Sequence, residues 1–365
     1  MVKYGLYHFE KIAFNSTQRL PRLDRYIIII FGSLIILDMN IRRARSSDKH
    51  KVLDFCINTF AWGDYIDRAW DNWISEPSSL LFVCETQLSS FISKSDLVGV
   101  IHILQCSNNS LWIEGLRIHK LYRNNGFATA LLNHSIDYGI ENNLNECCAL
   151  VSQGNFASQK MLEKLGFLKL FTCTYYNIKL EKLGFTGKKL STFTNISSIK
   201  LVIKTPQLAD VAKIHRYLSN PNTTKIMDDR YFDSWRFYKF NMDYSNLVLL
   251  IKSNELLIVL NEDDRIVGVI MMKTIVSQDS FDKKSVIQIS YFNCIKRSLY
   301  LKVLYLLLEK YHNDMRFDDI QVFLPTFLGL GKFLSFESID YSDRFYLYAK
   351  KLRIFGTGCN IPVND

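Results

Sequence analysis

An internal repeat constrains the fold of this chain more than any other feature. The pentapeptide LVGVI at residues 97–101 returns as IVGVI at residues 266–270. Each copy follows a polar turn, and each is preceded by an apolar segment typical of a strand, LLFVCE at 80–85 and ELLIVL at 255–260. Two matches at the same relative position indicate a repeated structural unit.

The flanking segments extend the repeat in both directions. Upstream, IRRARSSD (41–48) and LVIKTPQLAD (201–210) each have the pattern of a strand that runs into a helix start. Downstream, an apolar strand and an amphipathic helix follow in both halves, within 110–141 and within 285–312. The order of elements agrees while the loop lengths differ, so the sequence predicts two copies of one fold.

Length and composition agree with two ordinary domains. The chain has 365 residues, 48% of them apolar, and a mean hydropathy near zero. Its formal net charge of +9 favours an anionic partner such as a phosphorylated cofactor. The basic residues are scattered and form no Lys/Arg-rich run, so we expect no nucleic-acid partner.

The cysteines and histidines give no sign of a metal site. The 8 cysteines contain no CxxC pair; seven lie among apolar or β-type residues, and Cys359 lies in the tail. This pattern predicts buried, reduced thiols in a cytoplasmic protein. The 7 histidines form neither HxxxH nor HExxH, so we expect no metal.

The N-terminal segment is treated separately. YIIIIFGSLIIL, at 26–37, is a continuous apolar run of 12 residues, whereas a membrane-spanning helix needs about 20. A membrane-tethered protein is an alternative that depends on this run alone. Met39 opens MNIRRARSSD, which has the pattern of a domain start, with Ser47 or Asp48 as helix N-cap. We therefore expect residues 1–38 to be an extension that the native protein lacks.

The pattern from residue 40 to residue 180 predicts an α+β domain with a mixed sheet. The expected strands are 41–45, 80–86, 97–104, 110–119, 148–153 and 167–180, and the expected helices are 48–60, 65–75, 127–141 and 156–166. The polar stretch that follows has the composition of a linker. The predicted division is a first domain at 39–182, a linker at 183–198, a second copy at 199–353 and a tail at 354–365.

The strand that ends near Ile118 leads through a short loop into the helix that begins near Gly126. The first turn of a helix presents N–H groups without intrahelical partners and the positive end of the helix dipole. Glycine lets a phosphate approach the backbone, and Arg123 can add an ionic contact. An ordinary Asn-Gly turn is the alternative reading of the same residues.

Two motifs decide between these readings. Arg123-x-x-Gly126-x-Ala128 after a strand resembles the Q/R-x-x-G-x-G/A signature of the GNAT superfamily of N-acetyltransferases. NFASQKMLEKLGF, at 155–167, resembles the second signature of that family, and Gly166 suits a helix C-terminus. The resemblance implies a GNAT fold, with a mixed, mostly antiparallel sheet flanked by helices. The second copy has no glycine in the matching segment, 291–301, and is expected to be a degenerate GNAT-like domain.

The resemblance also implies how acetyl-CoA is bound. Backbone amides around the loop and first helical turn would hold the pyrophosphate, the backbone of two strand residues would align the pantetheine, and two residues of the second motif would lie near the cofactor. These residues are Arg123, Asn124, Asn125, Gly126, Phe127, Ala128 and Thr129 for the pyrophosphate, Leu116 and Ile118 for the pantetheine, and Asn155 and Ser158 in the second motif.

Acetyl transfer to an amine needs no covalent enzyme intermediate when both reactants are held in line. The amine must be neutral, and Glu114 is the candidate general base, because strand alternation places it on the face of Leu116 and Ile118. An inert, salt-bridged strand residue is the alternative. A tyrosine often stands in the second motif as general acid, but Leu162 occupies that position here, so another group or water must protonate the thiolate.

The acceptor is expected to contact the first two helices. Asp64 and Tyr65 could face an amine, whereas Trp70 and Trp73 are expected in the core. A weaker resemblance of GDYIDRAWDNW and EGLR to the histidine N-acetyltransferase-like branch implies a free amino acid, with Arg117 as its carboxylate partner. A peptide amine stays open as acceptor. A non-catalytic acyl-CoA sensor is the competing function, and a monomer or homodimer is expected.

Overall fold

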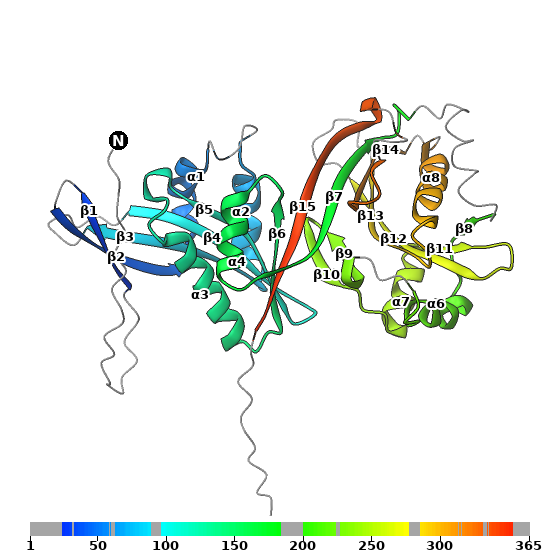
Figure 1. Ribbon diagram of the computed structural model, residues 1–365, viewed down its shortest axis with the longest axis horizontal. Coiled ribbons are helices and arrows are strands. Elements are labelled where there is room, and N and C mark those ends of the chain that lie inside the picture. The colour runs from blue at the N-terminus through cyan, green and yellow to red at the C-terminus, as the bar shows by residue number, and fades with distance from the viewer. Residues whose placement is uncertain are drawn as a thin grey trace, which may run out of the picture. The chain divides into compact units, whose positions relative to one another are not determined.

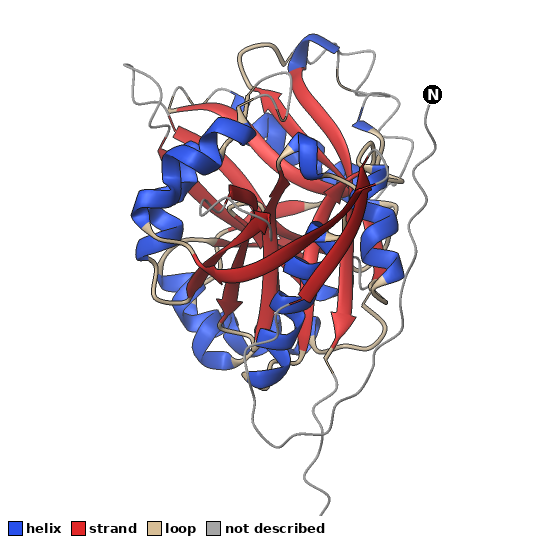
Figure 2. Cartoon of the chain, turned by 90° about the vertical axis from the view of Figure 1, so that its left-hand side faces the viewer, coloured by secondary structure: helices blue, strands red, loops and turns tan. Residues whose placement is uncertain are grey.

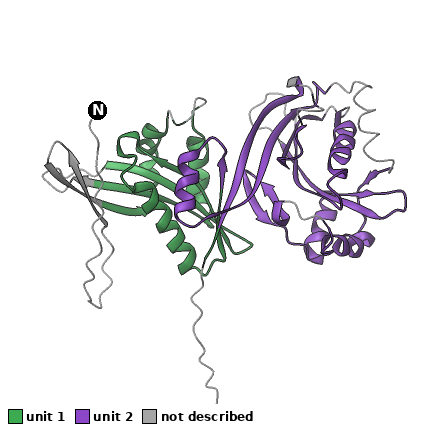
Figure 3. Cartoon of the chain, in the orientation of Figure 1, with its two compact units in different colours: residues 1–149, 350–365 green, residues 150–349 purple. Residues whose placement is uncertain are grey.

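A computed structural model shows the arrangement of the chain (Figure 1). It describes residues 24–30, 33–57, 59, 63–88, 96–183, 200–223, 227–276, 285–312, 314, 316–330, 334 and 336–352. Figure 3 shows two compact units, unit 1 with 1–149 and 350–365, and unit 2 with 150–349. The division between the units falls inside the range predicted for the first domain. Of the predicted linker, only Leu183 is described, and the tail lies outside the described residues.

Unit 1 contains a sheet in the order β1-β2-β3-β4-β5-β6. Neighbouring strands are antiparallel except β5 and β6, which are parallel. The strands are β1 (Asp24–Ile30), β2 (Ser33–Arg43), β3 (Ser79–Leu88), β4 (Asp96–Cys106), β5 (Ser110–Ile118) and β6 (Glu146–Ser152), the last of which runs across the unit boundary. The sheet is therefore mixed and mostly antiparallel, as predicted.

Helices cover both faces of this sheet (Figure 2). They are η1 (Ser46–Asp48), α1 (Lys49–Cys56), α2 (Ile66–Ser75), η2 (Lys120–Tyr122) and α3 (Phe127–Glu141). An apolar core joins α1 and α2 to β3 and β4, and it contains Trp70 and Trp73, which are 1% and 4% exposed. These two tryptophans are core residues, as expected. The predicted helix 48–60 ends earlier, at Cys56.

The apolar run at 26–37 forms strands. Residues 24–30 pair with residues 33–39 in an antiparallel hairpin, so β2 begins at Ser33 rather than at the predicted residue 41. The run is rich in isoleucine, whose β-branched side chain favours extended backbone. No helix in the described residues is long and apolar enough to cross a membrane.

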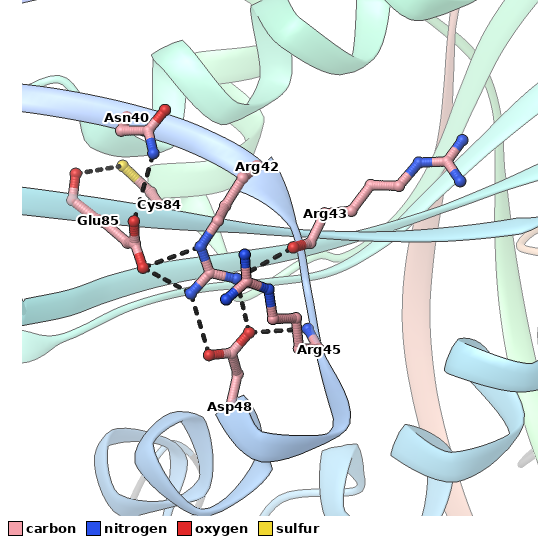
Figure 4. A network of polar contacts seen from close by, with 7 residues as sticks. All are labelled: Asn40, Arg42, Arg43, Arg45, Asp48, Cys84 and Glu85. Carbon is pink, nitrogen blue, oxygen red and sulfur yellow. Dashed lines mark hydrogen bonds and ion pairs between the residues drawn. The ribbon is translucent and has the colours of Figure 1, made fainter.

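A polar network fixes the start of α1 against the sheet (Figure 4). Arg42 on β2 donates to Asp48 at 2.7 Å and to Glu85 on β3 at 2.5 Å. Asp48 also accepts from the Arg45 amide at 2.8 Å. Burial opposes ionisation of Asp48, but the Arg42 guanidinium and the Arg45 amide together hold the pKa of this carboxyl below its usual value.

Unit 2 contains a seven-stranded sheet in the order β15-β7-β14-β13-β12-β11-β8 and a separate β9-β10 hairpin. Its strands are β7 (Leu168–Lys179), β8 (Val202–Lys204), β9 (Arg230–Asp233), β10 (Arg236–Lys239), β11 (Leu256–Leu260), β12 (Ile266–Val276), β13 (Ser285–Cys294), β14 (Phe317–Pro325) and β15 (Ile339–Lys351). Its helices are α4 (Phe156–Lys164), η3 (Leu208–Asp210), α6 (Val211–Leu218), η4 (Met227–Asp229), α7 (Tyr244–Lys252), α8 (Leu299–His312) and η6 (Phe336–Ser338).

The predicted repeat is present in the topology. Strands β11, β12 and β13 are antiparallel, β14 is parallel to β13, and α8 connects these two, as α3 connects β5 and β6. The glycine of the repeated pentapeptide is closely packed in both copies. A Cβ on Gly99 would lie 2.7 Å from Ile118, and a Cβ on Gly268 would lie 3.0 Å from Val259. Close packing of neighbouring strands explains why both copies have glycine here.

Candidate active site

Strand β5 is hydrogen-bonded to β6 over only its first residues. The parallel ladder runs from Ser110 opposite Glu146 to Trp112 opposite Cys148 and ends there. Past Trp112, no other strand of the described chain forms a ladder with this edge of β5. The backbone of Leu116 and Ile118 is therefore placed to hydrogen-bond an extended chain laid along the strand.

The carbonyl groups of these two residues already accept bonds from arginine side chains. Leu116 O accepts from the terminal nitrogen of Arg117, and Ile118 O accepts from Arg123 Nε, both at 3.1 Å. A carbonyl oxygen has two lone pairs, so each retains a second acceptor position. The Arg123 side chain thus bonds back to β5, although the motif suggested a phosphate contact for it.

A bulge lies in the second half of β5. Glu114 pairs with His102 of β4, but the next pair joins Arg117 to Val100, so β5 contains one residue more than its partner. Gly115 lies at this place with φ +66°. Only glycine adopts the left-handed region at no cost, and a left-handed glycine is typical of a bulge.

The bulge makes the predicted side-chain parity wrong. We expected Glu114 on the face of Leu116 and Ile118, but paired residues share a face, so Glu114 lies on the face of Arg117. This face carries α1 and α2. Ile118 lies on the opposite face, where its Cδ1 and that of Leu131 on α3 both approach Gly99.

Helix α3 begins with a left-handed glycine. Gly126 is its N-cap with φ +83° and ψ −11°, and Asn124 has φ +65°. The first intrahelical bond runs from Ala130 N to Gly126 O at 2.9 Å, so the amides of Ala128 and Thr129 precede the hydrogen-bonded part of the helix. Left-handed residues on either side of Asn125 give the loop the alternation of an anion-binding nest.

The corresponding loop of unit 2 has a different conformation. All residues from 285 to 312 are described, and none of them has a positive φ. A glycine-free loop between β13 and α8 therefore does not reproduce the left-handed turn that precedes α3. Of these two described loops, only the one before α3 therefore has the left-handed turn.

Glu114 has two hydrogen-bond partners on the sheet. Its Oε1 lies 3.0 Å from His102 Nδ1, and its Oε2 accepts from Trp112 Nε1 at 3.0 Å. His102 is fully buried, while the Glu114 side chain is 17% exposed. The candidate base is therefore held in one orientation with limited access to solvent.

Asp64, Tyr65 and Arg117, the three residues expected to bind the acceptor, lie together. In this structure they contact one another. Arg117 donates from Nε to Asp64 Oδ2 at 2.7 Å and from a terminal nitrogen to Oδ1 at 3.1 Å. The guanidinium also lies 5.3 Å from the centre of the Tyr65 ring. Burial raises the pKa of Tyr65 to about 12, with Arg117 opposing the rise, so the phenol keeps its proton at neutral pH.

Cysteine thiols near the site are poor nucleophiles. All seven cysteines of the described chain are buried thiols. Burial raises the pKa of Cys56, close to Asp64, to about 12, and does the same for Cys84 and Cys147. A protonated thiol does not attack a thioester, which agrees with direct transfer to an amine.

Asn155 and Ser158 belong to unit 2. Asn155 is the N-cap of α4, and its side chain accepts from the Ser158 amide at 3.2 Å. Leu162, at the position of the family's tyrosine, is 3% exposed and lies in the apolar interior. Asn155 and Ser158 thus have a local role in starting α4.

His102 and Ser79 were missed in the sequence. His102 follows the repeated pentapeptide LVGVI directly, where the second copy has Met271 after IVGVI. A lone histidine inside an apolar strand, at a position where the other copy has an apolar residue, was the available signal. Its partners could not be identified from the sequence because they come from two other strands.

Residues 49–167 match the model of the acetyltransferase (GNAT) family. A GCN5-related N-acetyltransferase from Sphaerobacter thermophilus has a similar fold, with a TM-score of 0.51 and 12% identity over 86% of this chain and 96% of that one. A fungal multi-domain GH3 beta-N-acetylglucosaminidase with a GCN5-related glucosamine N-acetyltransferase region gives a TM-score of 0.54 and 10% identity over 86% of this chain and 38% of that one. A tandem GNAT protein of clavulanic acid biosynthesis gives 0.43 and 9% identity over 87% and 99%. No curated protein matches the sequence.

Proposed function

Because this chain carries a GNAT acetyltransferase domain at residues 49–167, we propose that it transfers the acetyl group of acetyl-CoA directly to a primary amine. Both reactants would be bound together, with no acetyl-enzyme intermediate. Holding the amine in line with the thioester carbon would supply much of the rate enhancement.

The start of α3 is the observation that carries this proposal. Left-handed Asn124 and Gly126 precede a helix whose first amides include those of Ala128 and Thr129. Such a turn fits a pyrophosphate, which would contact the backbone from Arg123 to Thr129. The pantetheine would lie along Leu116 and Ile118, at the β5 edge past Trp112.

Glu114 is the proposed proton acceptor. An α-amine with a pKa of about 8 is roughly 10% neutral at pH 7, whereas a lysine amine, with a pKa of about 10.4, is far below 1% neutral. A lysine amine therefore needs a general base more than an α-amine does. Glu114 is partly exposed and lies on the same face as Arg117, Asp64 and Tyr65, where an acceptor would bind.

A free amino acid is the acceptor that this face suits best. Its carboxylate would bind the Arg117 guanidinium, which would then be shared with Asp64, and its amine would point toward Glu114. Arg117 already has a carboxylate partner, so binding requires an exchange or sharing of hydrogen bonds.

The test is release of free thiol from acetyl-CoA in the presence of an amine panel. Free histidine, other amino acids, lysine peptides and polyamines would be compared at equal concentration. We expect release with at least one free amino acid and acetylation of its α-amine by mass spectrometry. Acetyl-CoA binding without release for any amine would favour a sensor, a reading that Leu162 in place of a tyrosine also favours.

A further inference from the structure

Aromatic rings gather on one face of the sheet in unit 2. Tyr175 of β7 pairs with Phe323 of β14, and Tyr341 of β15 pairs with Asn177, two residues further along β7. Paired residues share a face of the sheet, so the three rings lie on the same side. The ring centroid of Tyr175 is 5.1 Å from that of Phe323 and 6.0 Å from that of Tyr341.

The β9–β10 hairpin adds Trp235 to this face. Its ring centroid lies 4.5 Å from that of Tyr175 and 5.6 Å from that of Phe323. These four residues, Tyr175, Phe323, Tyr341 and Trp235, are called the aromatic patch below. Core packing accounts for Tyr175 and Phe323, each 4% exposed, but not for Trp235 and Tyr341, which are 45% and 49% exposed. Two large accessible rings next to a buried one mark a surface suited to a ligand.

Trp235 occupies a turn position that disfavours a bulky residue. Asp233 pairs with Arg236, so Ser234 and Trp235 form a two-residue turn, and their φ angles are +50° and +67°. Glycine and asparagine suit such a turn, whereas a tryptophan in the left-handed region strains the backbone. The turn thus holds the indole against the patch in spite of this strain, and strained backbone is concentrated at functional sites.

Carboxylates border the aromatic patch. Asp319 of β14 and Asp343 of β15 lie on the same sheet face as Tyr175. The exposed Asp340 reaches this face across a break in the β15 ladder, and its Oδ2 accepts from Asn177 Nδ2 at 3.3 Å. Asn177 Nδ2 also donates to Asp319 Oδ2 at 2.8 Å. Burial raises the pKa of the Tyr175 phenol, and the negative charge of Asp319 adds to the rise, so this charge acts on the patch.

Basic side chains of the described residues only partly balance these carboxylates. Lys179 Nζ lies 3.4 Å from Asp319 Oδ2, whereas Asp340 and Asp343 form no ion pair within the described chain. Asp319 Oδ1 and Asn177 Oδ1 are buried oxygens that accept no hydrogen bond from any described residue. Unsatisfied buried oxygens and surplus negative charge favour a cation that brings N–H donors.

We propose that this face of unit 2 binds a primary alkylammonium ion, with the ammonium group at Asp340 and the alkyl chain across the aromatic patch. The carboxylate accepts the N–H groups, and the π-electrons of Tyr341 attract the positive charge. The chain lies against Tyr175 and Trp235. Tyr175 and Asn177 are about 6.6 Å apart along β7, close to the length of a butyl chain. This binding does not depend on the proposed acetyl transfer.

The test is an NMR titration of the full chain, labelled with 15N in tryptophan, and it needs no acetyl-CoA. The probes are butylammonium and butanol, which has a similar shape and no charge. We expect the indole N–H signal of Trp235, assigned by its loss in Trp235→Phe, to shift saturably with butylammonium. The Kd for butanol should be at least about 10-fold higher. Equal affinities, or a Trp235 signal that does not move, would overturn the proposal.

Two further probes define the ligand. Tetramethylammonium has the charge but no N–H donor, so we expect its Kd to be roughly 3- to 10-fold higher than that of butylammonium. Tighter binding of tetramethylammonium would contradict a site for primary amines. Nα-acetyl-lysine methylamide carries a butylammonium chain in a peptide setting. The tighter binder of this compound and butylammonium identifies the source of the ligand as a lysine side chain or a free amine.

Substitutions at exposed positions locate the site. Asp340→Asn and Tyr341→Leu should each raise the Kd for butylammonium by roughly 3- to 10-fold. The matched controls are Asp263→Asn, in the exposed turn between β11 and β12, and Tyr244→Leu, on α7 with 51% exposure. Both controls should leave the Kd unchanged. An unchanged Kd in Asp340→Asn and Tyr341→Leu, or an equal rise in the controls, would overturn the proposal and leave the proposed acetyl transfer intact.

Discussion

Arg117 and Asp64 form a two-pronged ion pair that ties β5 to the segment before α2. The two bonds measure 2.7 and 3.1 Å, and the side chains are only 12% and 5% exposed. Burial opposes the charge of Arg117, but the bonds to Asp64 outweigh it and raise the pKa of the guanidinium. Each of these nearly buried charges is therefore stabilised by its partner, which replaces the water that burial removes.

Removal of one partner of this pair should therefore cost more than removal of both. We expect Arg117→Met to lower the free energy of unfolding by about 3 kcal/mol, because Asp64 is left as an unpaired, nearly buried charge. Adding Asp64→Asn should recover part of this loss. Urea denaturation of the two single variants and the double variant measures the coupling. Strictly additive losses would show that the pair is not coupled.

The network of Arg42, Asp48 and Glu85 should stabilise the protein against acid. The pKa of Asp48 is lower in the folded protein than its ordinary value, so its stabilisation is present above about pH 4 and is lost as the pH falls through the folded value. Asp48→Asn should lower stability at pH 7 by about 1–3 kcal/mol and flatten the fall below pH 4. Asp54→Asn, at an exposed position of α1, is the control for charge. Chemical denaturation at several pH values gives both curves, and parallel curves for Asp48→Asn and wild type would refute the assignment.

Gly115 should tolerate no side chain. A Cβ there would lie 2.7 Å from the Trp73 ring, at φ +66°, whereas a Cβ on Gly63, at φ +99°, would meet nothing within 4 Å. Both substitutions to alanine introduce backbone strain, of about 1–2 kcal/mol, but only Gly115→Ala adds a clash that costs roughly 1–3 kcal/mol more. Thermal or urea unfolding of both variants isolates the clash. Equal losses would mean that Trp73 moves aside freely.

Glu114→Gln should reduce activity according to the basicity of the amine. For a lysine-type acceptor, we expect kcat/KM to fall by roughly 100- to 10,000-fold, and for an α-amine by less, because more of the α-amine is already neutral. The Kd for acetyl-CoA should not change. Steady-state kinetics with both acceptor types measures the ratio. The same loss for both acceptors would argue that Glu114 orients the reactants rather than accepts a proton.

The order of helices and strands was predictable because hydrophobic periodicity reports burial directly. The helix start at Gly126 was predictable for the same local reason, since its glycine precedes an apolar helical pattern. The face of the sheet on which Glu114 lies was not predictable. Strand alternation assumes an uninterrupted ladder, whereas the bulge at Gly115 adds one residue to β5. The apolar run at 26–37 was ambiguous, since a short apolar segment fits several structures equally well.

Side-chain partners were the least predictable part of the site. Arg117 and Asp64 were each assigned to an acceptor, yet they bond to each other from positions far apart in the sequence. His102 reaches Ser79 and Glu114 on two neighbouring strands, a juxtaposition that depends on the register of the whole sheet. Local patterns contain no information on such register.

The central claim is that the turn before α3 binds the pyrophosphate of acetyl-CoA. The most direct measurement is the Kd for acetyl-CoA, by calorimetry, of the wild type, Gly126→Asn and Gly126→Asp. Asparagine and aspartate have the same shape and both tolerate a left-handed backbone, so they differ here in one negative charge. We predict measurable binding for the wild type, weaker binding for Gly126→Asn, and a further loss of at least about 10-fold for Gly126→Asp. Equal affinity of the two variants, at the level of the wild type, would contradict the site.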